Sequence, residues 1–226
     1  MTLLAAEGYC AVQAIRFGDD VLERLAEARA FMRTHDVRIG SWWLCERSTP
    51  ADVEAQLLAA GLVKVPGDYE VAGMLLTHEP PAGPPDVEAR RVRDADEYAA
   101  ARELQYEVFD SPADHRRTRD QLIAQFDGST DAGAVYGAWI DGELVAVGRA
   151  FFAREGAILA GGATAEHARG RGAYRALVRA RWDDVAARGG GALVVQAGSM
   201  SEPILRRLGF EHVLQFHRLE DVLPAA

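Results

Sequence analysis

The stretch from Ile158 to Arg181 constrains the fold more than any other part of this chain. It opens with the short apolar run Ile158–Ala163, which is bounded by glycine and is typical of a buried strand. An Arg-Gly-Arg-Gly turn follows at Arg169–Gly172. Apolar and long side chains then recur at helical spacing, at Leu177, Arg181 and Val185. The stretch therefore predicts a strand, a glycine-rich turn and a helix in immediate succession.

This order of elements suits the binding of a phosphate or a pyrophosphate. The first N–H groups of a helix have no partner inside the helix, and they carry the positive end of its dipole. Gly170 and Gly172 remove side chains that would hold an anion away from those groups. Arg169 and Arg171 add full charges at the rim. We interpret these four residues and the start of the helix as a pyrophosphate cradle; a plain, solvated connection is the alternative.

Three other glycine-rich sites fit the sequence less well. A nucleotide P-loop needs Lys followed by Ser or Thr after its last glycine, and that pair is missing here. The spacing does not complete the dinucleotide-binding fingerprint, and no acidic residue ends a following strand at the proper distance. An RNA-binding Arg-Gly tract would repeat, whereas this one occurs once in an acidic chain.

Two motifs together resemble a known superfamily. The run Arg169–Ala173 followed by Leu177 is similar to the acyl-CoA signature of the GNAT superfamily of N-acetyltransferases. The later run Leu205–Phe210 is similar to the ending of that family's last helix, with Leu208, Gly209 and Phe210 in order. The resemblance covers roughly Val87 to Val222. It implies an α/β fold with a GNAT-like mixed, mostly antiparallel sheet flanked by helices.

The first part of the chain reads as a smaller partial repeat of this domain. A strand, a short helix ending at Gly61 and a closing strand occur there in the same order as in the last forty-odd residues. We expect a degenerate GNAT-like domain at 1–79, a Pro-rich linker at 80–86 and the acyl-CoA-binding domain at 87–226. The first domain has no glycine-rich cradle and should not bind the cofactor. Strand–helix–strand order also recurs by chance in α/β proteins.

Local signals predict several further elements. Asp20 with Glu23, and Asp94 with Glu97, have the spacing of helix capping boxes. The run Ser48–Pro50 predicts another helix start, and a charged helix is expected at His115–Phe126. Asp141-Gly142 between two apolar runs predicts a hairpin.

Composition limits the partners. The formal charge of −9 argues against nucleic-acid and anionic-membrane partners and suits a cationic substrate such as an amine. Cys10 and Cys45 have no paired spacing, so neither a disulfide framework nor a metal site is expected. The N-terminus lacks the pattern of a signal peptide, which makes a cytoplasmic location the default expectation.

The resemblance implies an acyl-CoA-dependent N-acyltransferase, which transfers acetyl from acetyl-CoA to a small amine by direct attack. The alternative is a catalytically impaired acyl-CoA-binding regulatory module. Acetyl-CoA is the expected acyl donor, and a monomer or homodimer is expected. The cofactor-binding residues implied are Ala163, Thr164, Arg169, Gly170, Arg171, Gly172, Ala173 and Tyr174.

Catalytic roles follow from the same resemblance. Backbone N–H groups at Ala163 or Thr164 are the candidates for oxyanion stabilisation. Leu205 stands where the family carries a tyrosine that protonates the leaving thiol, so Ser199 or Ser201 acting through water is a candidate. Ser199 also has the spacing to cap a helix with Glu202. His167 has the right intrinsic basicity for deprotonating an amine, and it could equally be an exposed loop residue.

The acceptor pocket in this family borders the turn between the first two helices. Glu107, Asp110 and His115, with Asp114 beside them, fall on that turn and could attract a cation. They also read as an ordinary solvated turn. The identity of the amine is not indicated by any of these residues.

Overall fold

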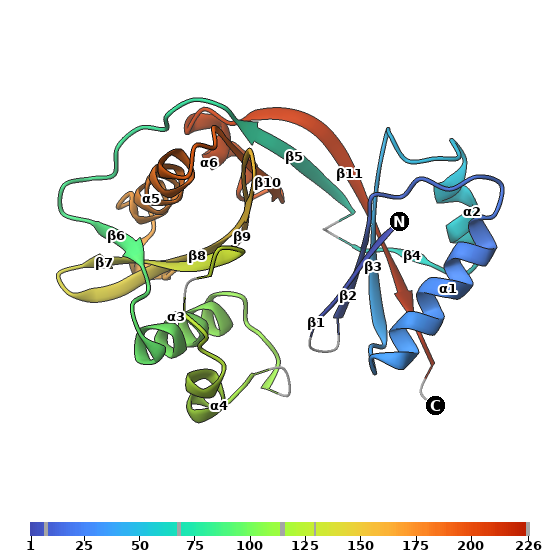
Figure 1. Cartoon of the computed structure of the whole chain (residues 1–226), viewed down its shortest axis with the longest axis horizontal. Coiled ribbons are helices and arrows are strands. Elements are labelled where there is room, and N and C mark those ends of the chain that lie inside the picture. The colour runs from blue at the N-terminus through green and yellow to red at the C-terminus, as the bar shows by residue number, and fades with distance from the viewer. Residues whose placement is uncertain (7–8, 67–68, 114–115, 129, 225–226) are drawn as a thin grey trace. The chain divides into compact units, whose positions relative to one another are not determined.

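The computed structural model describes residues 1–6, 9–66, 69–113, 116–128 and 130–224 (Figure 1). The chain forms two compact units. The first comprises Met1–Gly73, Ala197–Glu202 and His212–Ala226, and the second comprises Met74–Gln196 and Pro203–Glu211. The units are therefore not the continuous ranges 1–79 and 87–226 expected from the sequence.

The last strand accounts for this difference. Strand β11 (Glu211–Val222) pairs antiparallel with β3 (Ile39–Cys45), and the register sets Leu219 opposite Trp42. This ladder joins Phe216–Val222 to the whole of β3. A ladder of that length satisfies the backbone hydrogen bonds of the strand, so the C-terminal segment belongs to the first unit.

The second unit contains a five-stranded path through the sheet. Its order is β10-β9-β8-β7-β6, with β10 parallel to β9 and the other neighbours antiparallel. The strands are β6 (Glu88–Arg91), β7 (Gly133–Ile140), β8 (Glu143–Ala153), β9 (Gly156–Thr164) and β10 (Ala192–Ala197). Helices α3 (Ala95–Val108) and α5 (Ala173–Ala187) lie on opposite faces of this sheet, and α4 (Arg119–Ala124) packs beside α3 (Figure 1). The expected mixed, mostly antiparallel sheet flanked by helices is confirmed.

The first unit places two helices against a second set of strands. Its elements are β1 (Thr2–Ala6), β2 (Tyr9–Gln13), α1 (Val21–Thr34), β3, α2 (Val53–Ala59), β4 (Val63–Lys64) and β11. Strand β2 runs parallel to β3, while β1 is antiparallel to β2, and β11 is antiparallel to β3 and β4. Strand β5 (Glu70–Leu76) begins in this unit and ends in the second, and α6 (Glu202–Arg207) also starts here. In the described part of the chain, no helix is long and apolar enough to cross a membrane.

The helix caps agree with the sequence in one case and differ in another. Asp94 caps α3, because its carboxylate accepts a hydrogen bond from the Glu97 N–H at 2.9 Å. The box expected at Asp20 is wrong: that carboxylate accepts instead from the Gly18 N–H at 3.2 Å and from Arg24 Nε at 2.7 Å. The guanidinium one turn away provides a charged partner, which outcompetes a neutral backbone donor.

Two other helices are shorter than expected. Helix α2 begins at Val53, after the predicted start at Ser48–Pro50. Helix α4 is confined to Arg119–Ala124 and begins with a capping box at Thr118; part of the expected helix, residues 114–115, lies outside the described residues. The hairpin prediction is confirmed, because Asp141 and Gly142 join β7 to β8 at φ values of 52° and 83°. Positive φ at both central residues is what a two-residue hairpin turn requires.

The Asp94 cap can be tested by its stability effect. Asp94→Ala removes the acceptor of the Glu97 N–H and should lower the free energy of unfolding by ~1 kcal/mol. Asp94→Asn keeps a good capping oxygen, so its free energy of unfolding should differ from that of the unchanged protein by only about a few tenths of a kcal/mol. Urea denaturation followed by circular dichroism measures both, and an equal loss in the two variants would contradict the capping role.

Candidate functional site

The predicted succession of strand, glycine-rich turn and helix is present. Strand β9 ends at Thr164, a single 3₁₀ turn follows at Glu166–Ala168, and α5 begins at Ala173. Gly170 has a φ of 80° and Gly172, the N-cap of α5, a φ of 83°. Residues that carry a side chain rarely adopt this left-handed backbone conformation, so the path of the turn depends on these two glycines.

The N–H groups at the start of α5 are available to a ligand. The first helical hydrogen bond runs from the Ala176 N–H to the Gly172 carbonyl at 3.0 Å. The N–H groups of Arg169 and Arg171 donate to carbonyls of the 3₁₀ turn at 3.2 and 3.3 Å. Among the hydrogen bonds of the described residues, none engages the N–H of Gly170, Gly172, Ala173 or Tyr174. These four donors lie at the positive end of the helix dipole, which is the environment that an anion needs.

The proline-rich segment, residues 79–86, lies along α5. A Cβ on Gly83 would come within 2.7 Å of the Ala176 Cβ, and one on Gly172 within 2.5 Å of Pro84 Cγ. Arg179 of α5 pairs with Glu79 at 2.6 Å and donates to the Pro80 carbonyl at 3.3 Å. Gly172 is thus required twice, for the backbone conformation of the cradle and for the close packing of this segment.

Strand β9 leaves β10 partway along its length. Their parallel ladder joins residues 156–159 to 192–195, and beyond Leu159 the described ladder of β9 continues only with β8. Gly161 and Gly162 form a β-bulge there, since two residues of β9 stand opposite Gly148 of β8. Gly161 has a φ of 60°. A bulge beside an opening strand pair exposes backbone groups that a regular ladder would consume.

The two predicted oxyanion donors face different ways. The Ala165 N–H donates to the Val145 carbonyl at 2.9 Å, and Thr164 stands opposite Ala146 in the register. Residues along an antiparallel strand alternate between facing the partner strand and facing away from it. Ala163 therefore directs its N–H toward β8. Thr164 directs its N–H away from β8, to the edge of β9 that is no longer paired with β10. Thr164 is the better oriented of the two.

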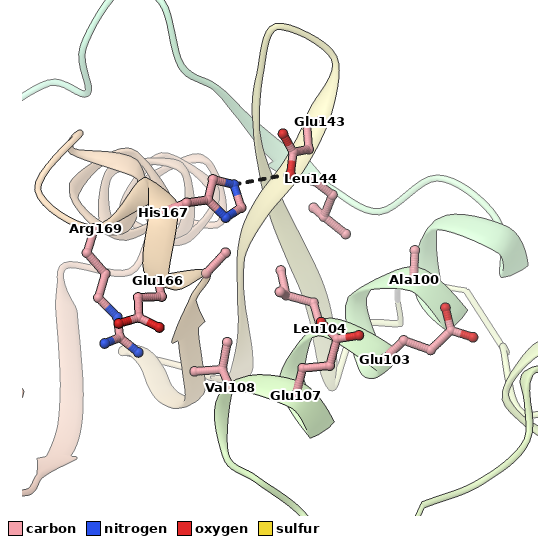
Figure 2. Close-up of a pocket in the computed structure, with 11 residues that line it drawn as sticks. Ala100, Glu103, Leu104, Glu107, Val108, Glu143, Leu144, Glu166, His167 and Arg169 are labelled. Atoms are coloured by element: carbon pink, nitrogen blue, oxygen red, sulfur yellow. Dashed lines mark ion pairs between the residues drawn. The ribbon is translucent and has the colours of Figure 1, made fainter.

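A pocket of about 560 Å³ opens between α3, the start of β8 and the loop after β9 (Figure 2). Figure 2 shows acidic side chains entering it from all three elements. It is lined by Ala100, Glu103, Leu104, Glu107, Val108, Glu143, Leu144, Ala165, Glu166, His167 and Arg169. Four carboxylates against one guanidinium and one imidazole favour a cation over an anion.

The sequence-predicted acceptor and catalytic residues are only partly brought together. Glu107 and His167 both line the pocket. His167 Nε2 lies 3.1 Å from Glu143 Oε1. Asp110 is exposed, at a φ of 45°, and does not line it. His115 lies outside the described residues, as does Asp114. Ser199 is exposed in the turn before α6 and belongs to the first unit, so its role stays a prediction.

Tyr174 points back toward β9. A Cβ on Gly162 would come within 2.8 Å of Tyr174 Cε2, so the ring lies directly against the bulge. Behind it, the guanidinium carbon of Arg181 lies 5.8 Å from the ring centroid, and its Nε donates to the Leu177 carbonyl at 2.9 Å. Arg181 is 1% exposed, and burial lowers the pKa of its guanidinium. Tyr174 thus links the cradle to the bulge.

Sequence reasoning missed two contributions to the site. Gln105 of α3 donates from Nε2 to the Gly161 carbonyl at 2.7 Å, across 56 residues of sequence. Glu103 and Glu143 join the pocket from α3 and β8. No local sequence signal connects these residues to β9, because only the packing of α3 on the sheet brings them there. No group of His, Cys, Asp or Glu side chains with the arrangement of a metal site occurs among the described residues.

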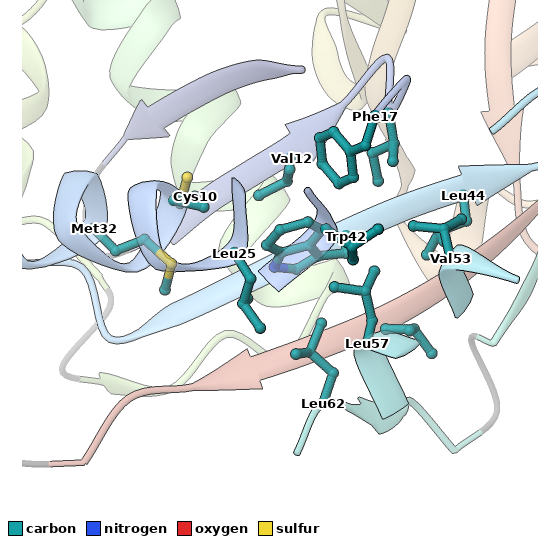
Figure 3. Close-up of a cluster of buried hydrophobic side chains, with 14 of the residues drawn as sticks. Cys10, Val12, Phe17, Leu25, Met32, Trp42, Leu44, Val53, Leu57 and Leu62 are labelled. Atoms are coloured by element: carbon teal, nitrogen blue, oxygen red, sulfur yellow. The ribbon is translucent and has the colours of Figure 1, made fainter. Parts of the chain in front are cut away.

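The first unit has a filled core (Figure 3). Trp42 is fully buried among side chains from α1, α2 and β2, including Val12, Leu25 and Leu57. In the described residues of this unit, Gly61 is the glycine with positive φ, and it follows α2 instead of preceding a helix. This part of the structure thus lacks a counterpart of the cradle.

Comparisons with known proteins identify the fold. No protein-family model and no curated protein sequence matches the chain. Among solved structures, a GCN5-related N-acetyltransferase from Kribbella flavida is 18% identical, with a TM-score of 0.71 over 100% of this chain and 90% of that one. One from Sphaerobacter thermophilus is 17% identical, with a TM-score of 0.69 over 99% and 76%. A tandem GNAT protein from the clavulanic acid biosynthesis pathway is 18% identical, with a TM-score of 0.64 over 97% and 76%.

The cradle yields a test that does not depend on turnover. Gly170→Glu places a negative charge beside the open N–H groups, at a position where a Cβ meets nothing within 4 Å. We expect the affinity for CoA to fall by about 2 kcal/mol, or ~30-fold, because the charge repels the diphosphate from the helix N-terminus. Isothermal titration calorimetry measures the change.

Two control variants separate charge from backbone strain in that experiment. Gly170→Ala carries the same strain without the charge and should retain most of the affinity. Gly128→Glu introduces the same charge at a φ of 78°, also in open space, and should bind CoA normally. Unchanged affinity in Gly170→Glu would mean that the cradle is assigned wrongly.

Proposed function

We propose that this chain, which has the fold of the GNAT N-acetyltransferases, is an acyl-CoA-dependent N-acyltransferase. It transfers acetyl from acetyl-CoA to a small amine by direct attack of the amine nitrogen. The observation that carries the proposal is the set of open N–H groups at Gly170, Gly172, Ala173 and Tyr174, next to a strand that separates from its neighbour. This combination accepts a diphosphate and an extended chain leading from it.

The residues of the second unit fit such a donor. The open N–H groups hold the diphosphate, and Arg169 and Arg171, both exposed, add charge at the rim. The backbone of Thr164 and of the Gly161–Gly162 bulge faces the gap between β9 and β10, where the pantetheine arm lies. Acetyl-CoA, when bound, supplies the activated thioester.

The chemistry needs positioning and stabilisation of charge. The neutral amine nitrogen forms a bond to the thioester carbonyl carbon, the C–S bond breaks, and the nitrogen loses a proton. Backbone N–H groups at Thr164 and at the bulge donate to the carbonyl oxygen as its negative charge develops. His167, whose Nε2 lies 3.1 Å from Glu143 Oε1, is the candidate that takes the proton which a cationic amine must lose before it attacks. The second proton, which the nitrogen loses after the C–N bond has formed, passes to water.

The position at which the family carries a proton donor for the leaving thiolate is occupied by a leucine here. Leu205, at the position of the family's tyrosine, is fully buried and has no proton to donate. A thiol has a pKa of roughly 8.5, so its thiolate leaves tolerably near neutral pH without one. Ser199, acting through water, remains the candidate from the sequence.

The pocket supports a cationic acceptor. Glu103, Glu107 and Glu166 supply negative charge beside the end of β9, and an alkylamine is protonated before it binds. Asp110 and His115 remain candidates for the same role on sequence grounds. The charge of −9 supports the absence of a nucleic-acid or membrane partner. The proposed location is the cytoplasm, and the proposed state is a monomer or homodimer.

The second candidate function is a regulatory module that binds acyl-CoA without turning it over. The specific observation in its favour is the buried Leu205 in place of a proton donor. It shares the cradle with the enzyme and differs only in catalysis.

A thiol-release assay distinguishes these functions. Acetyl-CoA is incubated with the protein across a panel of small amines, and free thiol is followed with a disulfide reagent while binding is followed by thermal shift. The enzyme should show saturable, amine-dependent release. Binding without release on any amine supports the regulatory module, and absence of both contradicts the proposal.

The acidic pocket leads to a separate prediction. Glu107→Gln should raise the KM of a cationic acceptor by about 1.4- to fivefold with kcat unchanged, since an exposed charge pair contributes roughly 0.2–1 kcal/mol. Glu46→Gln makes the same charge change at an exposed position of the first unit and should leave KM unaltered. Steady-state kinetics at low salt measure both, and equal effects would remove Glu107 from the pocket's function.

A further inference from the structure

Gln105 is a polar side chain on an otherwise apolar face of α3. Its neighbours on that face, Ala101, Leu104 and Val108, pack in a hydrophobic cluster with Val147 and Ala163 of the sheet. Gln105 itself is 9% exposed. Placing an amide in such a position is unfavourable unless both of its ends form hydrogen bonds. Both ends are bonded here, which makes the partners informative.

Arg102 determines which way the amide faces. Arg102 Nη1 donates to Gln105 Oε1, and a guanidinium has donors only. The amide oxygen must therefore face Arg102, so the NH₂ group faces β9 and donates to the Gly161 carbonyl at 2.7 Å. Arg102, Gln105 and Gly161 form a directional chain of hydrogen bonds from helix to strand.

Glycine at 161 is adapted to this contact. A Cβ at that position would lie 2.3 Å from Gln105 Nε2, closer than any real contact. The residue also has a φ of 60°, which a side chain would disfavour. Gln105 thus reaches a carbonyl that only a glycine in this conformation presents.

The bond to Gly161 sets the direction of the next N–H group. In a trans peptide, the carbonyl of one residue and the N–H of the following residue point in opposite directions within one plane. The Gly161 carbonyl points to Gln105 on α3, so the Gly162 N–H points away from α3. Gly162 is exposed and lies past the end of the β9–β10 ladder, with Tyr174 of α5 against it.

We propose that Gln105 is a positioning residue that fixes the Gly161–Gly162 peptide and thereby aims the Gly162 N–H at the thioester carbonyl oxygen. This inference rests on the proposed function, because the thioester enters through acetyl-CoA. Gln105 does not touch the reacting atoms. It prevents rotation of a diglycine peptide that has little conformational restraint of its own.

The kinetic test uses substitutions that alter only the end of the side chain. Gln105→Met keeps the length and removes the donor, and Gln105→Glu keeps the shape and replaces the donor by an acceptor. Loss of one oxyanion donor lowers kcat by about 10²–10³-fold, so partial misalignment should lower kcat by roughly 10–100-fold. The Kd of CoA should change by less than about twofold, because CoA without its acyl group lacks the thioester carbonyl at which the Gly162 N–H is aimed. Gln56→Met, at a partly exposed glutamine of α2 in the first unit, should change neither value.

A purely structural role predicts a different pattern. If Gln105 only filled space, Gln105→Met would retain kcat while Gln105→Glu lowered the thermal stability. Unchanged kcat in a folded Gln105→Met therefore overturns the proposal. Arg102→Met provides a second route if the Gln105 variants fold poorly, since it leaves the amide in place but removes the contact that orients it. It should lower kcat by about three- to tenfold with the same unchanged Kd of CoA.

A measurement without turnover separates this inference from the proposed function. The ¹⁵N relaxation order parameter of the Gly162 N–H should be about 0.85, as in rigid backbone, and should fall toward roughly 0.6 in Gln105→Met. Absence of CoA binding and of turnover in the unchanged protein would contradict the proposed function alone. The order parameter would then decide whether Gln105 holds the bulge. An unchanged order parameter in both Gln105→Met and Arg102→Met overturns the positioning role of Gln105.

Discussion

The site that we propose at the start of α5 depends on backbone N–H groups that have no acceptor within the described chain. At the start of α5, the conformation of Gly170 and Gly172 leaves these donors pointing outward with the helix dipole behind them. A side chain capping the helix would have satisfied them and removed the site. The helix instead begins at a glycine with no side-chain acceptor, and the proline-rich segment packs close to it without capping it. The binding of an anion that we propose for this helix start therefore depends on the absence of a side-chain cap.

Two glycine pairs serve the site for different physical reasons. Gly170 and Gly172 need left-handed backbone in a surface turn, and Gly172 also leaves room for Pro84. Gly161 and Gly162 form a bulge within the sheet, where Gln105 approaches the first and Tyr174 the second. The first pair provides open donors for a charged group. The second pair provides a peptide whose direction is controlled from a helix on the opposite face of the sheet from α5.

The regions that sequence reasoning described well are those in which the decisive partners are close in the chain. The Asp94 cap joins residues three positions apart, the Asp141-Gly142 hairpin turn is two residues long, and the glycine-rich turn of the cradle is four residues long. Where a stronger neighbour competes, local reasoning fails, as when Arg24 takes the carboxylate of Asp20. The acceptor residues illustrate a further limit. Glu107 lines the pocket but Asp110, three residues later, does not, because the helix ends between them and the chain turns away.

By itself, the sequence determined the strand–turn–helix unit and its glycine conformations, since these arise from short-range backbone preferences and hydrophobic periodicity. The mixed sheet flanked by helices was expected from the resemblance of two motifs to the GNAT superfamily. Tertiary structure alone decided that the last strand completes the first unit, through its ladder with β3. It also decided that Gln105 meets Gly161 and that carboxylates from α3, β8 and the loop after β9 share one pocket. These outcomes depend on how helices pack across strands far away in the chain, and no spacing within one segment encodes such a contact.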